Sequence, residues 1–307
     1  MLKFECLEQC LSCERTLLNT SLEHDIHYTI RNVFEYMFST NARLETISFV
    51  VVKHLFAFQN SIQSSNCLRL RSVLGNESIR RFKYILNTDL ASCRLKLASI
   101  LYCSGHLRAV ARVLEDLERI YHSKVKAVCG CVELEGDRDL QVFADMLSGH
   151  SVNEFSKPQF ACCVRFLRQE VYCTPVILLF KMNRNMSEKE VAQRGYADKQ
   201  WMDNAVVDSR PFLHYLQYLT YRGLGEREKQ LHVLGVLEFN ICDTRKQIQL
   251  YHPNTALHLL GHCYEMEGDY DSALHYYDES LRCCGTTNNA ANWHVQRVRR
   301  VRRLISG

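Results

Sequence analysis

The chain has 307 residues, 47% of them hydrophobic and 23% charged, which is ordinary for a folded protein and long enough for a sizeable core. The formal net charge of +4 is too small to indicate nucleic-acid binding by bulk electrostatics. Fifteen cysteines, with no apolar signal segment after Met1, predict reduced thiols and a cytoplasmic protein. The longest apolar run, Thr46 to Phe58, contains Lys53 and is too short to cross a membrane.

Residues 1–87 are predicted to be helical. Apolar residues recur at steps of three and four from Ile26 to Phe38, and again from Leu44 to Phe58, as they do on one face of a helix. Residues 1–18 and 76–87 are also predicted helices.

Helical hairpins are predicted next, and the clearest of them ends near Tyr277. Gly261 and Ala273 are small where two helices must approach closely, and Gly268 can adopt the positive φ that ends the first helix. Asp269 then caps the second helix, and Tyr277 fills the space between the pair. These residues match the tetratricopeptide pattern.

Two further hairpins are predicted, at Ala91–Tyr121 and Pro211–Cys242. The segment between them contains glycines and prolines and is predicted to be an irregular insertion of short helices, with room for one or two short strands. The fold prediction is therefore all-α: a right-handed array of tetratricopeptide-like hairpins with a central insertion and a C-terminal capping helix. The predicted regions are 1–87, 88–127, 128–205, 206–287 and 288–307.

Several short stretches share their residues with one family. They are Val128–Cys131, Glu135–Asp145, Tyr215–Tyr221 and Asn289–His294. They resemble the tetratricopeptide-like C-terminal region of molluscan proteins that are similar to cyclic GMP-AMP synthase-like nucleotidyltransferases of the male-abnormal family. The resemblance implies a helical adaptor region in innate immune signalling. The nucleotidyltransferase fold needs a Gly-Ser turn followed by acidic ligands, and this chain has no Gly-Ser dipeptide, so the catalytic portion is expected to be absent and the chain not to be an enzyme.

The first helix of the last hairpin carries the predicted partner-binding residues. On the concave side of a hairpin array they would line a groove for a peptide or a partner helix. They are Thr255, His258, His262, Glu265 and Met266. His258 and His262 also have the spacing of metal ligands, but Leu259 stands where a zinc protease needs glutamate. A purely structural role for the two histidines is the alternative.

Three groups of nearby cysteines are candidate zinc ligands: the first shares a helix face but lacks a fourth ligand, and the other two depart from the usual ligand spacing. They are Cys6 with Cys10 and Cys13, Cys162–Cys163 with Cys173, and Cys129 with Cys131. Buried cysteines that behave as small hydrophobic residues are the preferred interpretation. No metal and no cofactor is predicted.

The last helix has one apolar and one basic face. The basic face carries Arg297, Arg299, Arg300, Arg302 and Arg303. These arginines could bind phosphates, although a capping helix also needs a polar outer surface. Trp293 is predicted to pack against the terminal hairpin. The sequence thus predicts a non-catalytic scaffold or adaptor for a protein or peptide partner, without membrane contact, and nucleic-acid binding through this helix is the alternative.

Overall fold

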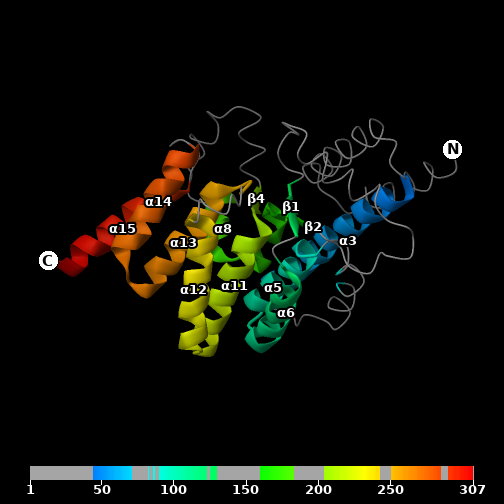
Figure 1. Ribbon diagram of the computed structural model, residues 1–307, viewed down its shortest axis with the longest axis horizontal. Helices are drawn as coiled ribbons and strands as arrows, with labels where there is room; N and C mark the ends of the chain where they lie inside the picture. Colours follow the sequence, from blue (N-terminus) through cyan, green and yellow to red (C-terminus); the bar gives the residue numbers. More distant parts are fainter. Residues whose placement is uncertain are drawn as a thin grey trace.

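In the computed structural model, the described residues are 44–70, 82, 86, 90–122, 125–129, 160–182, 204–242, 250–284 and 290–306. They are mostly helical, and the helices lie side by side along the long axis of the molecule (Figure 1). The α-helices are α3 (Leu44–Arg69), α5 (Ser92–Cys103), α6 (Leu107–Ile120), α8 (Val176–Leu179), α11 (Ser209–Leu224), α12 (Arg227–Cys242), α13 (Pro253–Glu267), α14 (Tyr270–Cys284) and α15 (Ala291–Ser306).

The three predicted hairpins are present as the helix pairs α5–α6, α11–α12 and α13–α14, whose members contact each other. Each pair is joined by a tight turn with a glycine at positive φ: Gly105 at 80°, Gly225 at 75° and Gly268 at 80°. Other residues reach this region only with strain, so the prediction of turn-closing glycines is confirmed. Helix α11 also contacts α6 and α13, and α14 contacts α15.

The two helices of the α13–α14 pair approach each other closely. A Cβ atom added to Gly261 would lie 2.8 Å from the ring of Tyr277, and Tyr277 and Ala273 are fully buried. Asp269 caps α14, because its carboxylate accepts the backbone N–H of Ser272 at 3.0 Å. The sequence-based roles of these residues are confirmed.

The central segment contains two small sheets, so the described chain is not purely α-helical. Strands β1 (Lys126–Val128) and β2 (Phe160–Cys162) pair in parallel, with Val128 opposite Cys162. Strands β3 (Val164–Leu167) and β4 (Asn204–Val207) pair antiparallel, with Val164 opposite Val207. The 3₁₀ helices η1 (Arg168–Cys173) and η2 (Phe180–Met182) flank α8. The prediction of short helices here is confirmed, and the described residues form more short strands than the one or two expected.

This central segment is part of the main core. Strand β3 and η1 contact α5, while β4 and α8 contact α13. The ring of Phe166 meets that of Phe212 edge-on, with centroids 5.6 Å apart, and the Ser99 hydroxyl donates to the Cys173 carbonyl oxygen at 2.6 Å. The segment predicted to interrupt the hairpins therefore packs against the first helix of each pair.

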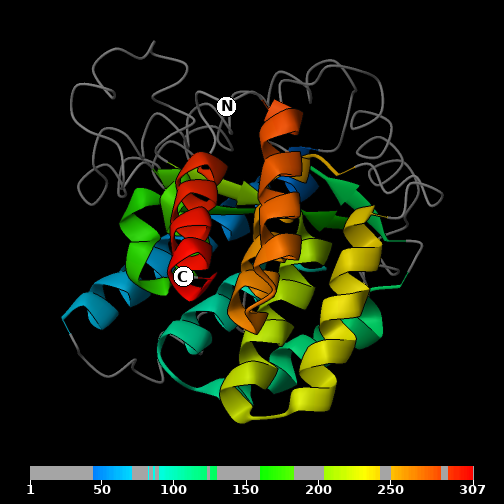
Figure 2. The ribbon, with the colours of Figure 1, turned by 90° about the vertical axis from the view of Figure 1, so that its left-hand side faces the viewer.

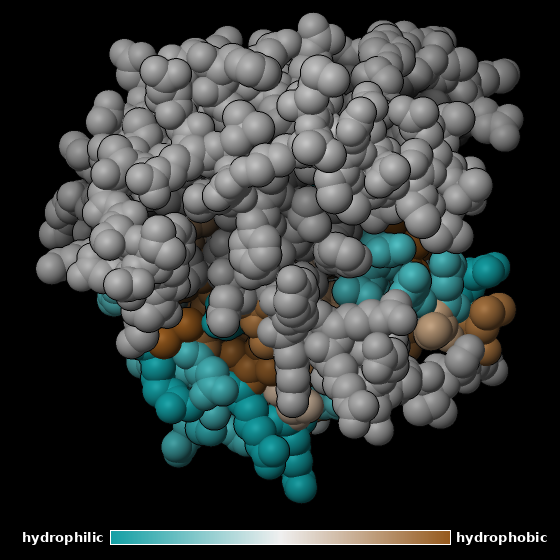
Figure 3. Space-filling view, turned by 90° about the vertical axis from the view of Figure 1, so that its right-hand side faces the viewer, coloured by the Kyte–Doolittle hydropathy of each residue, from teal (hydrophilic) through white to brown (hydrophobic). Residues whose placement is uncertain are grey.

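The view from the C-terminal side shows α15 in front with α14 beside it (Figure 2), and these two helices contact each other. On the opposite end, hydrophilic side chains gather at the lower left of the described part, with hydrophobic ones just above them (Figure 3). Among the described helices, none has the combined length and apolar character that a bilayer crossing requires. The helices predicted at 1–18 and 26–38, almost all of 76–87, and the cysteines 6, 10 and 13 lie outside the described residues.

Candidate functional site

Two of the predicted partner-binding residues on α13 are buried. Thr255 is 2% exposed and His258 is 1% exposed. The ring of His258 lies between Tyr277 of α14 and His294 of α15, with both centroid distances at 5.9 Å. These two residues therefore present no surface to a partner, and the prediction of a groove contact is wrong for them.

The other three predicted contacts are used within the chain. The Tyr215 hydroxyl is hydrogen-bonded to His262 Nδ1 at 2.9 Å. Glu265 forms an ion pair with Arg297 at 2.5 Å, and the side chain of Met266 packs against the core. The spacing did identify a real face of α13, but that face is the contact surface for α11, α14 and α15.

Helix η2 of the central segment also contributes a residue, Phe180, to the packing around this face of α13. The Phe180 ring stacks on Trp293 with centroids 4.4 Å apart and meets His294 edge-on at 4.6 Å. Trp293 was predicted to pack against the terminal hairpin; the ring partner that the structure gives it in the insertion is Phe180. The insertion thus contacts α15 through Phe180 and α13 through α8 and β4.

Burial makes the histidines of this region neutral. It lowers the pKa of His262 to about 4 and that of His294 to about 3, with Arg297 adding a smaller effect in the same direction. The pKa of His258 also lies well below its usual range because of burial. Both ring nitrogens of His258 are buried without a hydrogen-bond partner among the described residues. Protonation of any of these rings would oppose the packing of α15 on α13.

The basic face of α15 is largely matched by carboxylates of neighbouring helices. Besides the Arg297–Glu265 pair, Arg299 lies 3.6 Å from Asp278 and Arg302 lies 2.7 Å from Asp271. Arg300 and Arg303 are exposed, and Arg303 Nε donates to the Arg299 carbonyl oxygen at 3.3 Å. Three of the five predicted phosphate-binding arginines therefore already have acidic partners.

An exposed apolar line runs along the outer face of α12. Leu231 and Phe239 are 45% and 46% exposed, and they lie one helical turn on either side of Gly235. Among the described residues, a Cβ atom added to Gly235 would meet nothing within 4 Å. We name Leu231, Gly235 and Phe239 the α12 line. It was missed because the α12 sequence had been assigned entirely to hairpin packing.

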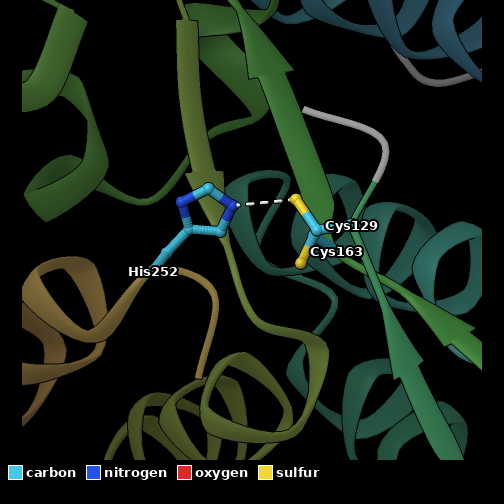
Figure 4. Close-up of side chains that lie close together, drawn as sticks. All are labelled: Cys129, Cys163 and His252. Atoms are coloured by element: carbon cyan, nitrogen blue, oxygen red, sulfur yellow. Dashed lines mark hydrogen bonds between the residues drawn. The ribbon is translucent and has the colours of Figure 1, made fainter. Parts of the chain in front are cut away.

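Cys129, Cys163 and His252 come together between the insertion and the start of α13 (Figure 4). Their ligand atoms all lie within 4.8 Å of one another, and Cys129 Sγ is 3.1 Å from His252 Nε2. Neither cysteine forms a disulfide with another described residue. Cys129 is fully buried and His252 is 8% exposed, while Cys163 is partly exposed. Burial lowers the pKa of His252 to about 4, with Lys181 acting in the same direction, so the imidazole is neutral at pH 7.

The carboxylate of Asp208 forms hydrogen bonds with the residues of this cluster. Its carboxylate accepts the backbone N–H of Tyr251 at 3.0 Å and that of His252 at 2.8 Å. The Cys163 thiol donates to the same carboxylate at 3.8 Å. Burial raises the pKa of Asp208, and the two backbone hydrogen bonds oppose that rise.

The sequence offered no local signal for this cluster, because its members come from three distant stretches. The cysteine pairs that had been compared with zinc spacings do not form it: Cys131 lies outside the described residues, and Cys173 lies elsewhere, 3.4 Å from the Ser61 hydroxyl. Only the strand register could have indicated that Cys129 and Cys163 meet.

Comparisons with known protein families, curated proteins and solved structures each found no significant match. The resemblance to the nucleotidyltransferase-like proteins therefore stays a prediction.

Proposed function

We propose that the chain is a non-catalytic interaction scaffold that binds an amphipathic helix of a partner protein on the α12 line. The observation that supports this proposal is the pair of half-exposed apolar side chains, Leu231 and Phe239, on either side of Gly235. Glycine within a helix costs about 1 kcal/mol relative to alanine, so a glycine at the middle of an exposed apolar line favours a packing role. The α12 line would then offer two apolar anchors, Leu231 and Phe239, with space for a partner's side chain at Gly235 between them.

The α13–α14 pair offers an internal parallel for this mode of binding. There, Gly261 lies in the middle of a helix and admits the ring of Tyr277 from the neighbouring helix. Gly235 has the same small size, but no atom of the described part of the chain lies within 4 Å of its Cβ position. A partner helix that presents one large side chain to Gly235, with apolar residues one turn to either side, would reproduce the contact. Helix-in-groove recognition uses anchors at this spacing.

The inner side of the hairpins is a weaker candidate surface. It contacts β3, η1, α8 and β4 of the same chain, so a peptide would have to displace the insertion. We propose that the hairpins form a tetratricopeptide-like array whose inner groove holds its own insertion and whose outer side faces partners. An adaptor role in innate immune signalling stays part of this proposal and rests on the sequence resemblance.

The test is affinity capture followed by titration with purified components. The wild-type chain, Phe239→Ser, Leu231→Ser and a control, Leu304→Ser, are used to capture proteins from a lysate. Leu304 is 76% exposed on α15 and lies away from the α12 line. We expect at least one captured protein to bind the purified wild-type and control chains equally and both α12 variants about tenfold more weakly or worse.

Equal binding by all four chains would remove the α12 line from the proposal. Circular dichroism of each variant shows whether the helices are intact. The non-catalytic part is tested separately, because incubation with nucleoside triphosphates and Mg²⁺ is expected to give no product. Product formation would contradict it whatever the capture result.

A further inference from the structure

We propose that Cys129, Cys163 and His252 form a structural Zn²⁺ site that fastens the insertion to the last hairpin. The proposal is independent of the α12 line. It rests on strand register, on the chemistry of the three ligands and on the buried carboxylate behind them.

Register brings the two cysteines together. In the parallel β1–β2 pair, Val128 lies opposite Cys162, so the next residues along both strands, Cys129 and Cys163, are neighbours at the end of the ladder. Adjacent strands lie about 4.8 Å apart. A shift of one residue in this pairing would point one of the thiols to the other face. The two sulfurs therefore meet because of backbone hydrogen bonding and not by chance proximity of long side chains.

The register of the second sheet and the carboxylate of Asp208 together place His252 beside the two cysteines. In the antiparallel β3–β4 pair, Val164 lies opposite Val207, which makes Asp208 the neighbour of Cys163 one step further. The Asp208 carboxylate accepts the backbone N–H groups of Tyr251 and His252. It thereby fixes the chain just before α13, and His252 Nε2 points at the Cys129 sulfur (Figure 4).

The ligand set is one that zinc prefers. Two thiolates and an imidazole are typical soft and borderline ligands for Zn²⁺ in tetrahedral coordination. Such an ion, with Zn–S bonds of about 2.3 Å and Zn–N bonds of about 2.0 Å, holds sulfur and nitrogen about 3.5 Å apart. The Cys129–His252 distance of 3.1 Å would need to widen by only about 0.4 Å.

Charge also favours a divalent cation. Binding would release one proton from each thiol to solvent, and the two resulting thiolates would neutralise Zn²⁺. A neutral complex suits a site where Cys129 is fully buried. Cys163 is partly exposed and marks the side on which a water molecule could fill the fourth position. Asp208 would lose the hydrogen bond from the Cys163 thiol when that thiol is deprotonated, but its two backbone hydrogen bonds would still hold the Tyr251–His252 backbone in place.

The test uses the full chain, made metal-free with a chelator under reducing conditions and titrated with Co²⁺ and then Zn²⁺. We expect one equivalent of Co²⁺ to produce thiolate-to-metal charge-transfer absorption, and Zn²⁺ to abolish it. Zn²⁺ should also raise the midpoint of thermal unfolding, because it binds only the folded state.

Variants report on the identity of the ligands. Charge-transfer intensity follows the number of bound thiolates, so Cys163→Ser should fall to about half and His252→Cys should rise to about 1.5 times the wild-type value. Cys242→Ser, whose thiol is exposed on α12, should match the wild type. Because His252→Cys keeps three ligands, it remains informative if Cys163→Ser fails to fold.

Absence of a charge-transfer band in the wild-type chain would overturn the proposal. So would an unchanged band in both Cys163→Ser and His252→Cys. A Cys129–Cys163 disulfide that persists under the reducing conditions, detected by mass spectrometry, would equally exclude a metal site.

Discussion

Lys96 and Glu170 form a buried ion pair that joins α5 to η1. Their side chains are 5% and 0% exposed, and Lys96 Nζ lies 2.5 Å from Glu170 Oε1. The second carboxylate oxygen accepts the backbone N–H of Leu167 at 2.7 Å. Lys96 Nζ also lies 3.9 Å from the centre of the Phe58 ring. The pair therefore links three parts of the core, and its removal tests how the insertion is held.

The expected loss in the free energy of unfolding depends on which of the two charges stays buried without its partner. Lys96→Met keeps an apolar contact with Phe58 but leaves the Glu170 carboxylate without its cation, at an expected loss of about 3–5 kcal/mol in the free energy of unfolding. Glu170→Gln keeps an oxygen for the Leu167 N–H and leaves the ammonium unpaired, at a similar loss. The double variant removes both charges and should lose much less than the sum of the two single losses.

The assay is urea unfolding followed by circular dichroism for the wild type, both single variants and the double variant. We expect a coupling energy of at least about 2 kcal/mol. Arg119→Met with Asp116→Asn serves as the matched control, because this ion pair is largely exposed and should give a coupling below about 1 kcal/mol. Single losses from Lys96→Met and Glu170→Gln that simply add would refute the account of a buried, mutually dependent pair.

Three further predictions concern the last hairpin. Gly261→Ala should lower the free energy of unfolding by about 1–3 kcal/mol in urea titrations, because its Cβ would lie 2.8 Å from the Tyr277 ring; an unchanged midpoint would contradict the close approach. The folded-state pKa values of His262 and His294 are about 4 and about 3, whereas the unfolded value is about 6.5. The unfolded chain therefore binds more protons than the folded chain at acidic pH. Stability should be full above about pH 6.5 and fall on acidification, and His262 should account for up to roughly 3 kcal/mol of this loss. Alanine at both positions should make this slope shallower, leaving the contribution of the other buried histidines, and an unchanged slope would contradict the assignment. Gel-shift titration with short RNA should show weak binding that Arg300→Ala scarcely alters, whereas tight binding lost in that variant would revive the nucleic-acid alternative.

The hairpins could be predicted because their determinants are local. Gly268 and Asp269 define the turn by their own backbone and side-chain preferences, and the small size of Gly261 and Ala273 is visible in the sequence. The helical periodicity around Leu44 likewise predicted α3. Local patterns of this kind need no knowledge of distant residues.

The candidate sites could not be predicted in the same way, because they depend on contacts between distant segments. The i, i+4 spacing of His258 and His262 correctly placed both on one face of α13. It could not show that Phe180 and α15 cover that face. The cluster at His252 depends on two strand registers that no single stretch reveals. The strands themselves are short, and their apolar residues resemble those of buried helices, so periodicity could not assign them firmly.

The packing of the central segment against the hairpins has a consequence for the order of folding. Each hairpin closes over a turn of a few residues, whereas the contact between Lys96 and Glu170 spans 74 positions. Closing so long a loop costs entropy that short-range contacts do not incur. The hairpins should therefore form early and expose their inner faces until the insertion docks, so that the stage most open to aggregation lies between these two events.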